Sequence, residues 1–391
     1  QQLAQFVIET PVSAIAEPIL ARAESAWVDT VGCALAGVDE PVVQLAQKLT
    51  TQAGPRAQGT LWGLPGRYHV RDAAFLNAIA AHALDYDDNM PNLRGHPSTT
   101  MLPAAWAAAQ AAGRRGDEML AAYVMGVEVG GKLGLALGHG HYGRGFHATA
   151  TAGIYGATAA AARLFGLDAS QLAMAWGFAA SQASGLTLNF GTMAKPFHAG
   201  HAARCAIDSV LMVQAGMTAH PAVFDGDRGA LTTYGGDGAV ALSELISQLS
   251  TPWEIENPGI FVKLWPCCYC SHRPIAALLQ LMADHGLKPD EVQAIEIGFP
   301  PGTDGGLIKG LPSTGLAGKF SVEYAAAATV VDGVVNLKTF SDDMLNRDQV
   351  QRLMHACRTY TVADDRRWSA TVGYNLVTLV TTQGRFECRV D

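Results

Sequence analysis

The chain has 391 residues, of which 49% are hydrophobic and 16% charged, and its formal net charge is −8. This length allows two domains with a large core, and the low charge favours closely packed helices whose buried surface extends into an oligomer interface. The negative net charge argues against nucleic acid or an anionic membrane as a partner, whereas an anionic substrate needs only a local positive field.

Apolar periodicity and flanking glycines and prolines predict a series of helices over the first two thirds of the chain. The stretch 59–70 is punctuated by Gly and Pro and is expected to hold a short extended piece. Asp168 or Ser170 is expected to cap the helix predicted at 168–184. The predicted helices are 17–37, 40–53, 71–84, 98–112, 115–137, 148–165, 168–184 and 196–216.

The composition changes near residue 252, where an aromatic segment interrupted by prolines marks a boundary. Beyond it we predict helices at 273–286, 319–332 and 342–357, strands at 292–300 and 359–365, and two final strands joined at Gln383–Gly384. The expected organisation is a mainly α protein, with an all-helical domain over 1–262 and a smaller α+β domain over 263–391.

The first residues lack the basic segment and apolar core of a signal peptide, and the small-residue stretch 148–162 is typical of a packed helix rather than a membrane span. Seven cysteines without regular spacing favour reduced thiols. We therefore expect a cytoplasmic protein without a membrane partner.

The segment 186–206, LTLNFGTMAKPFHAGHAARCA, places Lys195 directly before Pro196 and a helix. Proline suits the first turn of a helix and favours an extended conformation for the residue before it. Lys195 is thus expected at or just before a helix N-terminus, where partial burial would lower its pKa and a bound carboxylate would be stabilised. A lysine in a surface turn is the structural alternative.

Two further segments repeat this arrangement. His96 precedes Pro97 and the helix 98–112, and His147 precedes the helix 148–165. Imidazoles at such positions tend to stay neutral near pH 7 and can exchange protons. If the three helix ends converge, they form a polyanion site.

The acidic segment HALDYDDN, residues 82–89, carries a second cluster. In a helix that continues to residue 89, His82, Asp85 and Asn89 would share one face. Buried like charges raise each other's pKa, so Asp87 and Asp88 beside them are unusual for an inert helix. A solvated acidic helix end is the alternative.

Two groups of residues suggest metal binding, but we expect no metal and no organic cofactor. Asp85, Asp87, Asp88 and His96 could hold Mg²⁺ or Fe²⁺, and Cys267, Cys268, Cys270 and His272 could hold zinc. The spacing of the cysteines matches no standard zinc site, and no base partner identifies a nucleophilic cysteine. A dinucleotide or nucleotide motif is absent from the sequence.

Four more side chains are candidates for the site, each with a structural role as an equal alternative. Arg144 suits a carboxylate clamp and Tyr142 an acid, both close to His147. Lys263 and Arg273 flank the cysteine-rich segment and could add positive charge. The histidines His198 and His201, by contrast, are expected to pack on a helix face.

Five motifs in order resemble the MmgE/PrpD family: HALDYDDN…GHPSTTMLPAA, GFHATATAGIYGATAAAARLFGLD, GTMAKPFHAGHAAR, KLWPCCYCSH and KFSVEYAAAATVVDG. The resemblance covers the chain from about residue 5. It implies a large helical domain, a smaller α+β lid domain, a homodimer, an active site at the domain junction and no cofactor. It also implies a return to the helical domain after the lid, so we expect a C-terminal segment to be missing.

The same resemblance implies particular pocket residues. Those of the decarboxylases in the family fall on Asp85, His96, His147, Lys195, Lys263 and Tyr324. Two positions depart from that pattern, since Asn89 stands where a threonine is expected and Cys268 where a histidine is expected. We expect Asn89, Cys268 and His272 to contact the substrate with Arg144, Lys263, Arg273 and Tyr324.

Members of this family share proton transfer at a carbon next to a carboxylate of a small di- or tricarboxylate. The predicted reaction is epimerisation of iminodisuccinate, with Lys195 and Tyr142 on opposite faces of the carbon and His147, His96 and Asp85 around them. The alternatives are a dehydratase of a 2-methylcitrate-like substrate, a decarboxylase, and a scaffold without activity.

Overall fold

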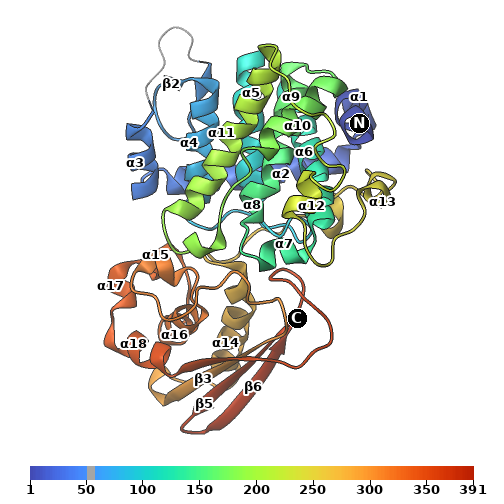
Figure 1. Cartoon of the computed structure of the whole chain (residues 1–391). Helices are drawn as coiled ribbons and strands as arrows, with labels where there is room; N and C mark the ends of the chain where they lie inside the picture. The colour runs from blue at the N-terminus through green and yellow to red at the C-terminus, as the bar shows by residue number, and fades with distance from the viewer. Residues whose placement is uncertain (51–57) are drawn as a thin grey trace. The chain divides into compact units, whose positions relative to one another are not determined.

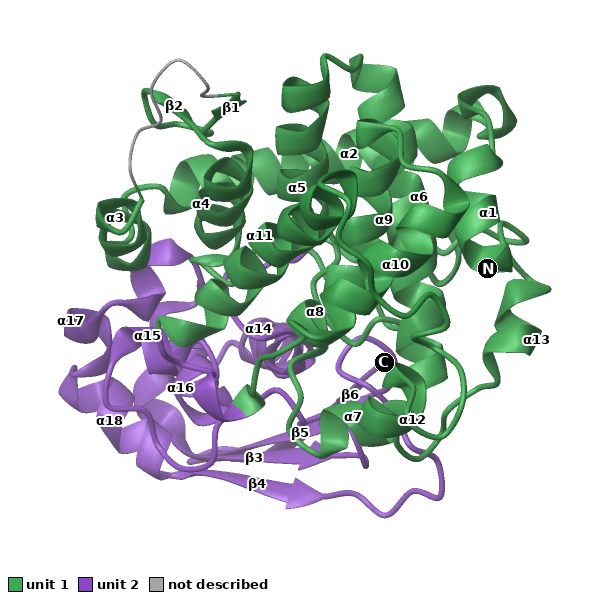
Figure 2. Ribbon diagram, turned by 45° about the horizontal axis from the view of Figure 1, so that its top comes forward, with its two compact units in different colours: residues 1–187, 193–262 green, residues 188–192, 263–391 purple. Residues whose placement is uncertain are grey.

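The computed structural model describes residues 1–50 and 58–391, and the fold is mainly α-helical. The chain divides into two compact units (Figure 1, Figure 2). Unit 1 comprises residues 1–187 and 193–262, and unit 2 comprises residues 188–192 and 263–391.

Unit 1 is built from helices with one short two-stranded ribbon, in which β1 and β2 pair antiparallel. Its helices are α1 Gln2–Glu9, α2 Glu17–Gly37, α3 Pro41–Lys48, α4 Val70–His82, α5 Ser98–Ala112, α6 Gly116–Leu137, α7 His139–Gly143, α8 Ala148–Thr151, α9 Gly153–Phe165, α10 Ala169–Ala180, α11 Ala194–Gln214, α12 Ala230–Tyr234 and α13 Leu242–Ile246. Its strands are β1 Gly59–Thr60 and β2 Arg67–Tyr68.

Most predicted helices of unit 1 are confirmed, because their caps are encoded locally. Asp168 caps α10 by accepting from the Gln171 N–H at 2.8 Å, as predicted. Gly113 ends α5 with a φ of 63°, a left-handed conformation that glycine adopts without strain. The predicted helix 40–53 is shorter, since α3 ends at Lys48, and its residues 51–53 lie outside the described residues.

The core of unit 1 is rich in alanine, and α6, α9 and α11 also carry buried glycines. Small side chains let helix backbones approach closely. A Cβ at Gly126 of α6 would lie 2.8 Å from the Gly156 carbonyl oxygen of α9, so this crossing requires glycine on both helices. The low charge content of the chain follows from this packing, because few helix faces reach solvent.

Helix α6 is the one helix in the described part of the chain that is long and apolar enough to cross a membrane. Of its most apolar window, 89% is buried inside the structure. The core helix of a folded domain has the same property, so its composition is explained by packing.

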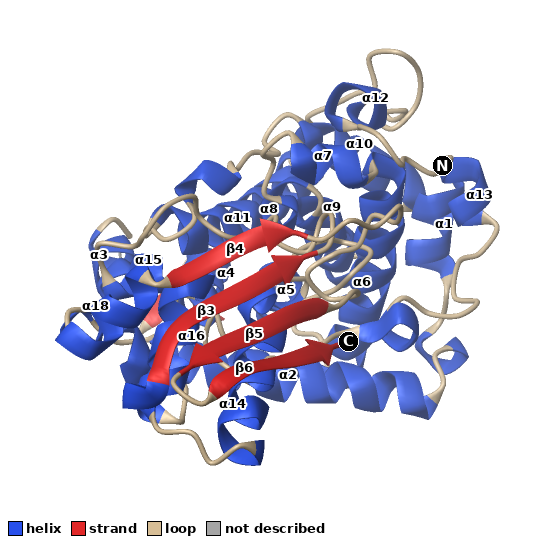
Figure 3. Cartoon of the chain, turned by 90° about the horizontal axis from the view of Figure 1, so that it is seen from below, coloured by secondary structure: helices blue, strands red, loops and turns tan. Residues whose placement is uncertain are grey.

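Unit 2 combines a four-stranded sheet with helices (Figure 3). Its strands, in the spatial order β4-β3-β5-β6, are β3 Val292–Phe299, β4 Cys357–Thr361, β5 Asn375–Thr381 and β6 Gly384–Val390. Its helices are α14 His272–Asp284, α15 Gly315–Gly318, α16 Val322–Asp332, α17 Asp342–Leu345 and α18 Asp348–His355. The short turns of helix in the chain are η1 Val12–Ala14, η2 Thr187–Asn189, η3 Ile255–Gly259, η4 Tyr269–Ser271, η5 Pro289–Glu291 and η6 Leu337–Phe340.

The central strand β3 pairs in parallel with β4 and antiparallel with β5, which forms a hairpin with β6. Helix α14 packs on β5 and β6, and α18 packs on β3. The α+β character and the final hairpin predicted for this region are confirmed. The predicted helix 342–357 is divided into α17 and α18.

Candidate active site

The segment between α4 and α5 folds back on the end of α4. The helix stops at His82, and Asp85 adopts a φ of 51°, which is rare for any residue but glycine, asparagine or aspartate. A left-handed residue cannot continue a right-handed helix. The predicted helix face shared by His82, Asp85 and Asn89 is therefore wrong, and the turn instead brings Asp85 and Asp87 around the helix end.

Lys195 is the centre of the resulting cluster. It is the second residue of α11, as the motif predicts for a helix N-terminus. Its backbone is helical and not extended as predicted, since Pro196 lies within the first turn of the helix, where its missing N–H costs no hydrogen bond. Its Nζ lies 2.5 Å from Asp85 Oδ1, 2.9 Å from His82 Nε2 and 3.5 Å from His96 Nε2. Lys195 is only 3% exposed, so its charge is met by protein groups rather than by solvent.

Asp87 lies behind the two histidines. Its carboxylate is 2.9 Å from His82 Nδ1 and 3.1 Å from His96 Nδ1. Burial alone would raise the pKa of Asp87, but the His82 and His96 imidazoles hold it well below the usual value. Burial, with Lys195 nearby and despite Asp87, lowers the pKa of His82 to about 4. His82 is thus neutral, and Asp87 ionised, at neutral pH.

A second pair of imidazoles adjoins this cluster. His147 directly precedes α8, and its Nδ1 lies 3.0 Å from Nδ1 of His198, one turn beyond Lys195 on α11. The His147 ring is stacked over His82 with centroids 5.9 Å apart. Burial and the charge of Lys195 hold the pKa of His147 well below its usual value, and burial lowers that of His198 to about 4. Both rings are therefore neutral proton carriers at pH 7.

Four possible metal-ligand atoms, one each on His82, Asp85, Asp87 and His96, lie within 4.8 Å of one another. Their separation alone would allow them to hold a metal ion. The Lys195 ammonium contacts two of these four side chains, Asp85 at 2.5 Å and His82 at 2.9 Å. A divalent cation there would be repelled by this fixed charge at short range and low dielectric. The arrangement suits proton transfer by a lysine better than metal binding.

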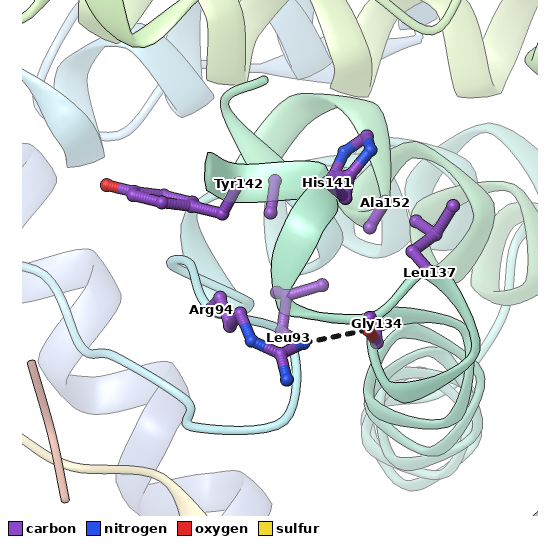
Figure 4. A pocket seen from close by; sticks show the side chains of 9 residues that line it. Leu93, Arg94, Gly134, Leu137, His141, Tyr142 and Ala152 are labelled. Atoms are coloured by element: carbon purple, nitrogen blue, oxygen red, sulfur yellow. Dashed lines mark hydrogen bonds between the residues drawn. The ribbon is translucent and has the colours of Figure 1, made fainter. Parts of the chain in front are cut away.

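Tyr142 lies on α7 and Arg144 directly after it, and Tyr142 borders a small pocket (Figure 4). Tyr142 lines this pocket with Arg94 and His141, and Arg94 donates to the Gly134 carbonyl at 2.9 Å. The pocket is lined by Leu93, Arg94, Gly134, Leu137, Gly138, His141, Tyr142, Ala148 and Ala152.

The Arg144 guanidinium donates to the carbonyl oxygens of Tyr234 and Gly235, at the end of α12. Arg144 in this structure therefore satisfies a helix C-terminus. A role as carboxylate clamp stays a prediction, and it requires that the guanidinium exchange one of these bonds for a substrate oxygen.

Models of the MmgE/PrpD N-terminal and C-terminal domains match residues 1–242 and 265–390. The chain belongs to the MmgE/PrpD family. Among its relatives, cis-aconitate decarboxylase of Homo sapiens is 27% identical over 88% of this chain and 72% of its own length. A cis-aconitate decarboxylase-like protein of Aspergillus oryzae is 30% identical over 90% of this chain and 77% of its own length. Cis-aconitate decarboxylase of Aspergillus terreus is 26% identical over 86% and 73%.

The remaining predicted site residues of this MmgE/PrpD chain fall into two groups. Asn89, in unit 1, exchanges backbone hydrogen bonds with Phe261, which ties the acidic turn to the end of that unit. The others belong to unit 2 and are described there: Lys263, Cys268, His272, Arg273 and Tyr324.

Within unit 2, Lys263 and Cys268 are buried, and the Cys268 N–H donates to the Lys319 carbonyl at 2.8 Å. His272 opens α14 with its ring stacked on Tyr269 at 4.6 Å between centroids. These contacts fix the side chains near the start of α14. Whether they touch a substrate stays a prediction.

Two predicted contacts of unit 2 are occupied by protein groups. Arg273 donates to the Ala370 carbonyl at 2.9 Å, and burial lowers its pKa. The Tyr324 hydroxyl donates to the Thr339 carbonyl, and burial raises its pKa to about 12. Both side chains hold unit 2 together in this structure.

The structure adds His82, Asp87 and His198 to the predicted catalytic residues, whereas the sequence places His82 only on a helix face with Asp85, and Asp87 only as a possible metal ligand. Neither role predicts that Asp87 lies between His82 and His96. His198 has the spacing of a packing residue, and only the fold shows that it contacts His147. The MmgE/PrpD chain thus builds its cluster from five segments: the end of α4, the turn after it, the start of α5, the start of α8 and the start of α11.

Proposed function

We propose that this chain catalyses proton transfer at a carbon next to a carboxylate of a small di- or tricarboxylate, with Lys195 as the proton carrier. The observation that carries the proposal is the contact of buried Lys195 Nζ with Asp85, His82 and His96. An amine fixed by three acceptors can deliver a proton to a defined point.

The chemistry requires a cation beside the reacting carbon. A carbanion next to a carboxylate is stabilised as an enediolate, whose negative charge must be met by preorganised donors. The Lys195 ammonium and the N-terminus of the 21-residue helix α11 supply that charge. The neutral rings of His82 and His147 can pass protons without competing for the negative charge.

Decarboxylation of a cis-aconitate-like substrate is the first candidate reaction, because the relatives are named for it. In that reaction the carbon–carboxylate bond breaks, its electron pair stays on the substrate as an allylic carbanion, and a proton from Lys195 Nζ forms the new C–H bond. Carbon dioxide leaves, and solvent returns the proton to the lysine.

Epimerisation of iminodisuccinate is the second candidate, and the features that favour it are Tyr142 and the departures at Asn89 and Cys268. Here one group removes the α-proton and another returns a proton to the opposite face. The Tyr142 hydroxyl is the proposed partner of Lys195. A dehydratase would instead expel a β-hydroxyl group from the same carbanion.

Proton NMR of the full chain in D₂O, with cis-aconitate and iminodisuccinate supplied separately, tests the proposal. Loss of one carboxylate with one deuterium in the product assigns decarboxylation, and deuterium at the α-carbon with inversion assigns epimerisation. Tyr142→Phe should stop epimerisation and leave decarboxylation intact. No turnover and no exchange with either acid or with 2-methylcitrate would refute the proposed chemistry.

A further inference from the structure

Asp87 occupies a position that its sequence neighbours do not explain. Its side chain is 0% exposed, and its carboxylate lies between two imidazoles. The contacts are 2.9 Å to His82 Nδ1 and 3.1 Å to His96 Nδ1. A single buried carboxylate therefore lies against the same nitrogen of two different rings, in a hydrogen bond with His82 and at ion-pair distance from His96.

This arrangement determines which nitrogen of each ring carries a proton. A carboxylate only accepts hydrogen bonds, and a neutral imidazole donates from one nitrogen and accepts at the other. Because Nδ1 of His82 and Nδ1 of His96 face Asp87, both rings are held with hydrogen on Nδ1. Their Nε2 lone pairs then point away from Asp87.

Both Nε2 atoms face the same ammonium group. Lys195 Nζ is 2.9 Å from His82 Nε2 and 3.5 Å from His96 Nε2, and its third acceptor is Asp85 Oδ1 at 2.5 Å. An ammonium has three N–H donors. With Nδ1–H on both rings each donor has an acceptor, whereas an Nε2–H ring would place hydrogen against hydrogen.

We infer that Asp87 is a positioning residue that fixes the tautomers of His82 and His96 and thereby orients the Lys195 ammonium. Asp87 acts only through the two rings. The part of the inference that concerns turnover rests on the proposed function, and the part that concerns the tautomers does not. Carboxylates that orient a catalytic or metal-binding imidazole in this way are worth about 10- to 10⁴-fold in activity.

The neighbouring residue provides a matched control. Asp88 is also 0% exposed, but its carboxylate accepts from the Ser98 hydroxyl, which in turn lies 2.5 Å from the Tyr123 hydroxyl. Burial raises the pKa of Asp88 well above its usual value, so Asn is a good mimic of its neutral form. Asp88→Asn changes a buried carboxyl beside Asp87 without touching either ring.

The direct experiment is a long-range proton–nitrogen NMR correlation on the full chain labelled with ¹⁵N in its histidines, without substrate. His82→Gln and His96→Gln identify the two signals. The expected result is hydrogen on Nδ1 of both rings in the wild type and in Asp88→Asn, and a shift towards Nε2–H in Asp87→Asn. Hydrogen on Nε2 of either ring in the wild type would overturn the inference, and this outcome does not depend on a variant that folds.

Kinetics separates this inference from the proposed function. With an active substrate, Asp87→Asn should lower kcat by about 10-fold or more and change KM little. Asp87→Asn with wild-type kcat would overturn the inference while the proposed function stands. If no polycarboxylate is turned over, the proposed function fails, and the tautomers still decide whether Asp87 positions the cluster.

Discussion

Acid should destabilise this fold through its buried histidines, and His82 allows the effect to be worked out. Its folded pKa of about 4 lies below the ordinary 6.5, so between these values the unfolded chain binds more protons and stability falls as the pH falls. The full difference is worth about 3 kcal/mol, of which about 2 kcal/mol is lost between pH 7 and pH 4.5. The groups that face His82 are Asp87, which raises its pKa, and Lys195, His96 and His147.

Urea denaturation of the wild type and of His82→Gln at pH 7 and pH 4.5 measures this term. His82→Gln is less stable at pH 7, since Asp87 loses a partner, but its loss of stability on acidification should be smaller by about 2 kcal/mol. The exposed His220 serves as control, and His220→Gln should follow the wild type at both pH values. An equal loss on acidification in His82→Gln and the wild type would refute the reasoning.

Two further variants test the close packing next to His96 and a buried group of ion pairs in unit 1. Gly95→Ala should lower Tm by an amount corresponding to about 1–3 kcal/mol, because a Cβ would lie 2.7 Å from the Thr149 N–H nitrogen. Gly116→Ala, with no neighbour within 4 Å, should not lower it, and equal Tm values for the two variants would contradict the prediction. Lys132→Met should cost about 3–5 kcal/mol in urea denaturation, because Lys132 lies 2.8 Å from one buried glutamate and 3.7 Å from another. A cost below about 1 kcal/mol would show that these carboxylates are satisfied without the lysine.

Local signals account for what the sequence predicts well. The caps at Asp168 and Gly113 and the alternating pattern of β3 are decided within a few residues, so the elements could be placed before the fold was known. The MmgE/PrpD motifs name Asp85, His96, His147 and Lys195, and the structure brings these four side chains together.

Non-local geometry accounts for what the sequence does not predict. The periodicity of His82, Asp85 and Asn89 favours one helix face, but the left-handed backbone of Asp85 ends the helix first. The contact of His147 with His198 joins residues 51 positions apart in the chain, and the contact of Asp87 with His96 depends on how the turn between them folds. No spacing rule identifies such pairs, because they depend on how α4, α5, α8 and α11 meet.

Proton transfer by Lys195 is the central claim, and deuterium incorporation from D₂O into the protonated carbon of the substrate tests it most directly. Lys195→Arg keeps the positive charge but holds its protons too tightly to transfer them, and Lys195→Met removes the charge. The account predicts that both variants lose incorporation by about 10²- to 10⁴-fold, while Lys195→Arg still shows a ligand-induced rise in Tm. Incorporation at the wild-type rate in Lys195→Arg would contradict it.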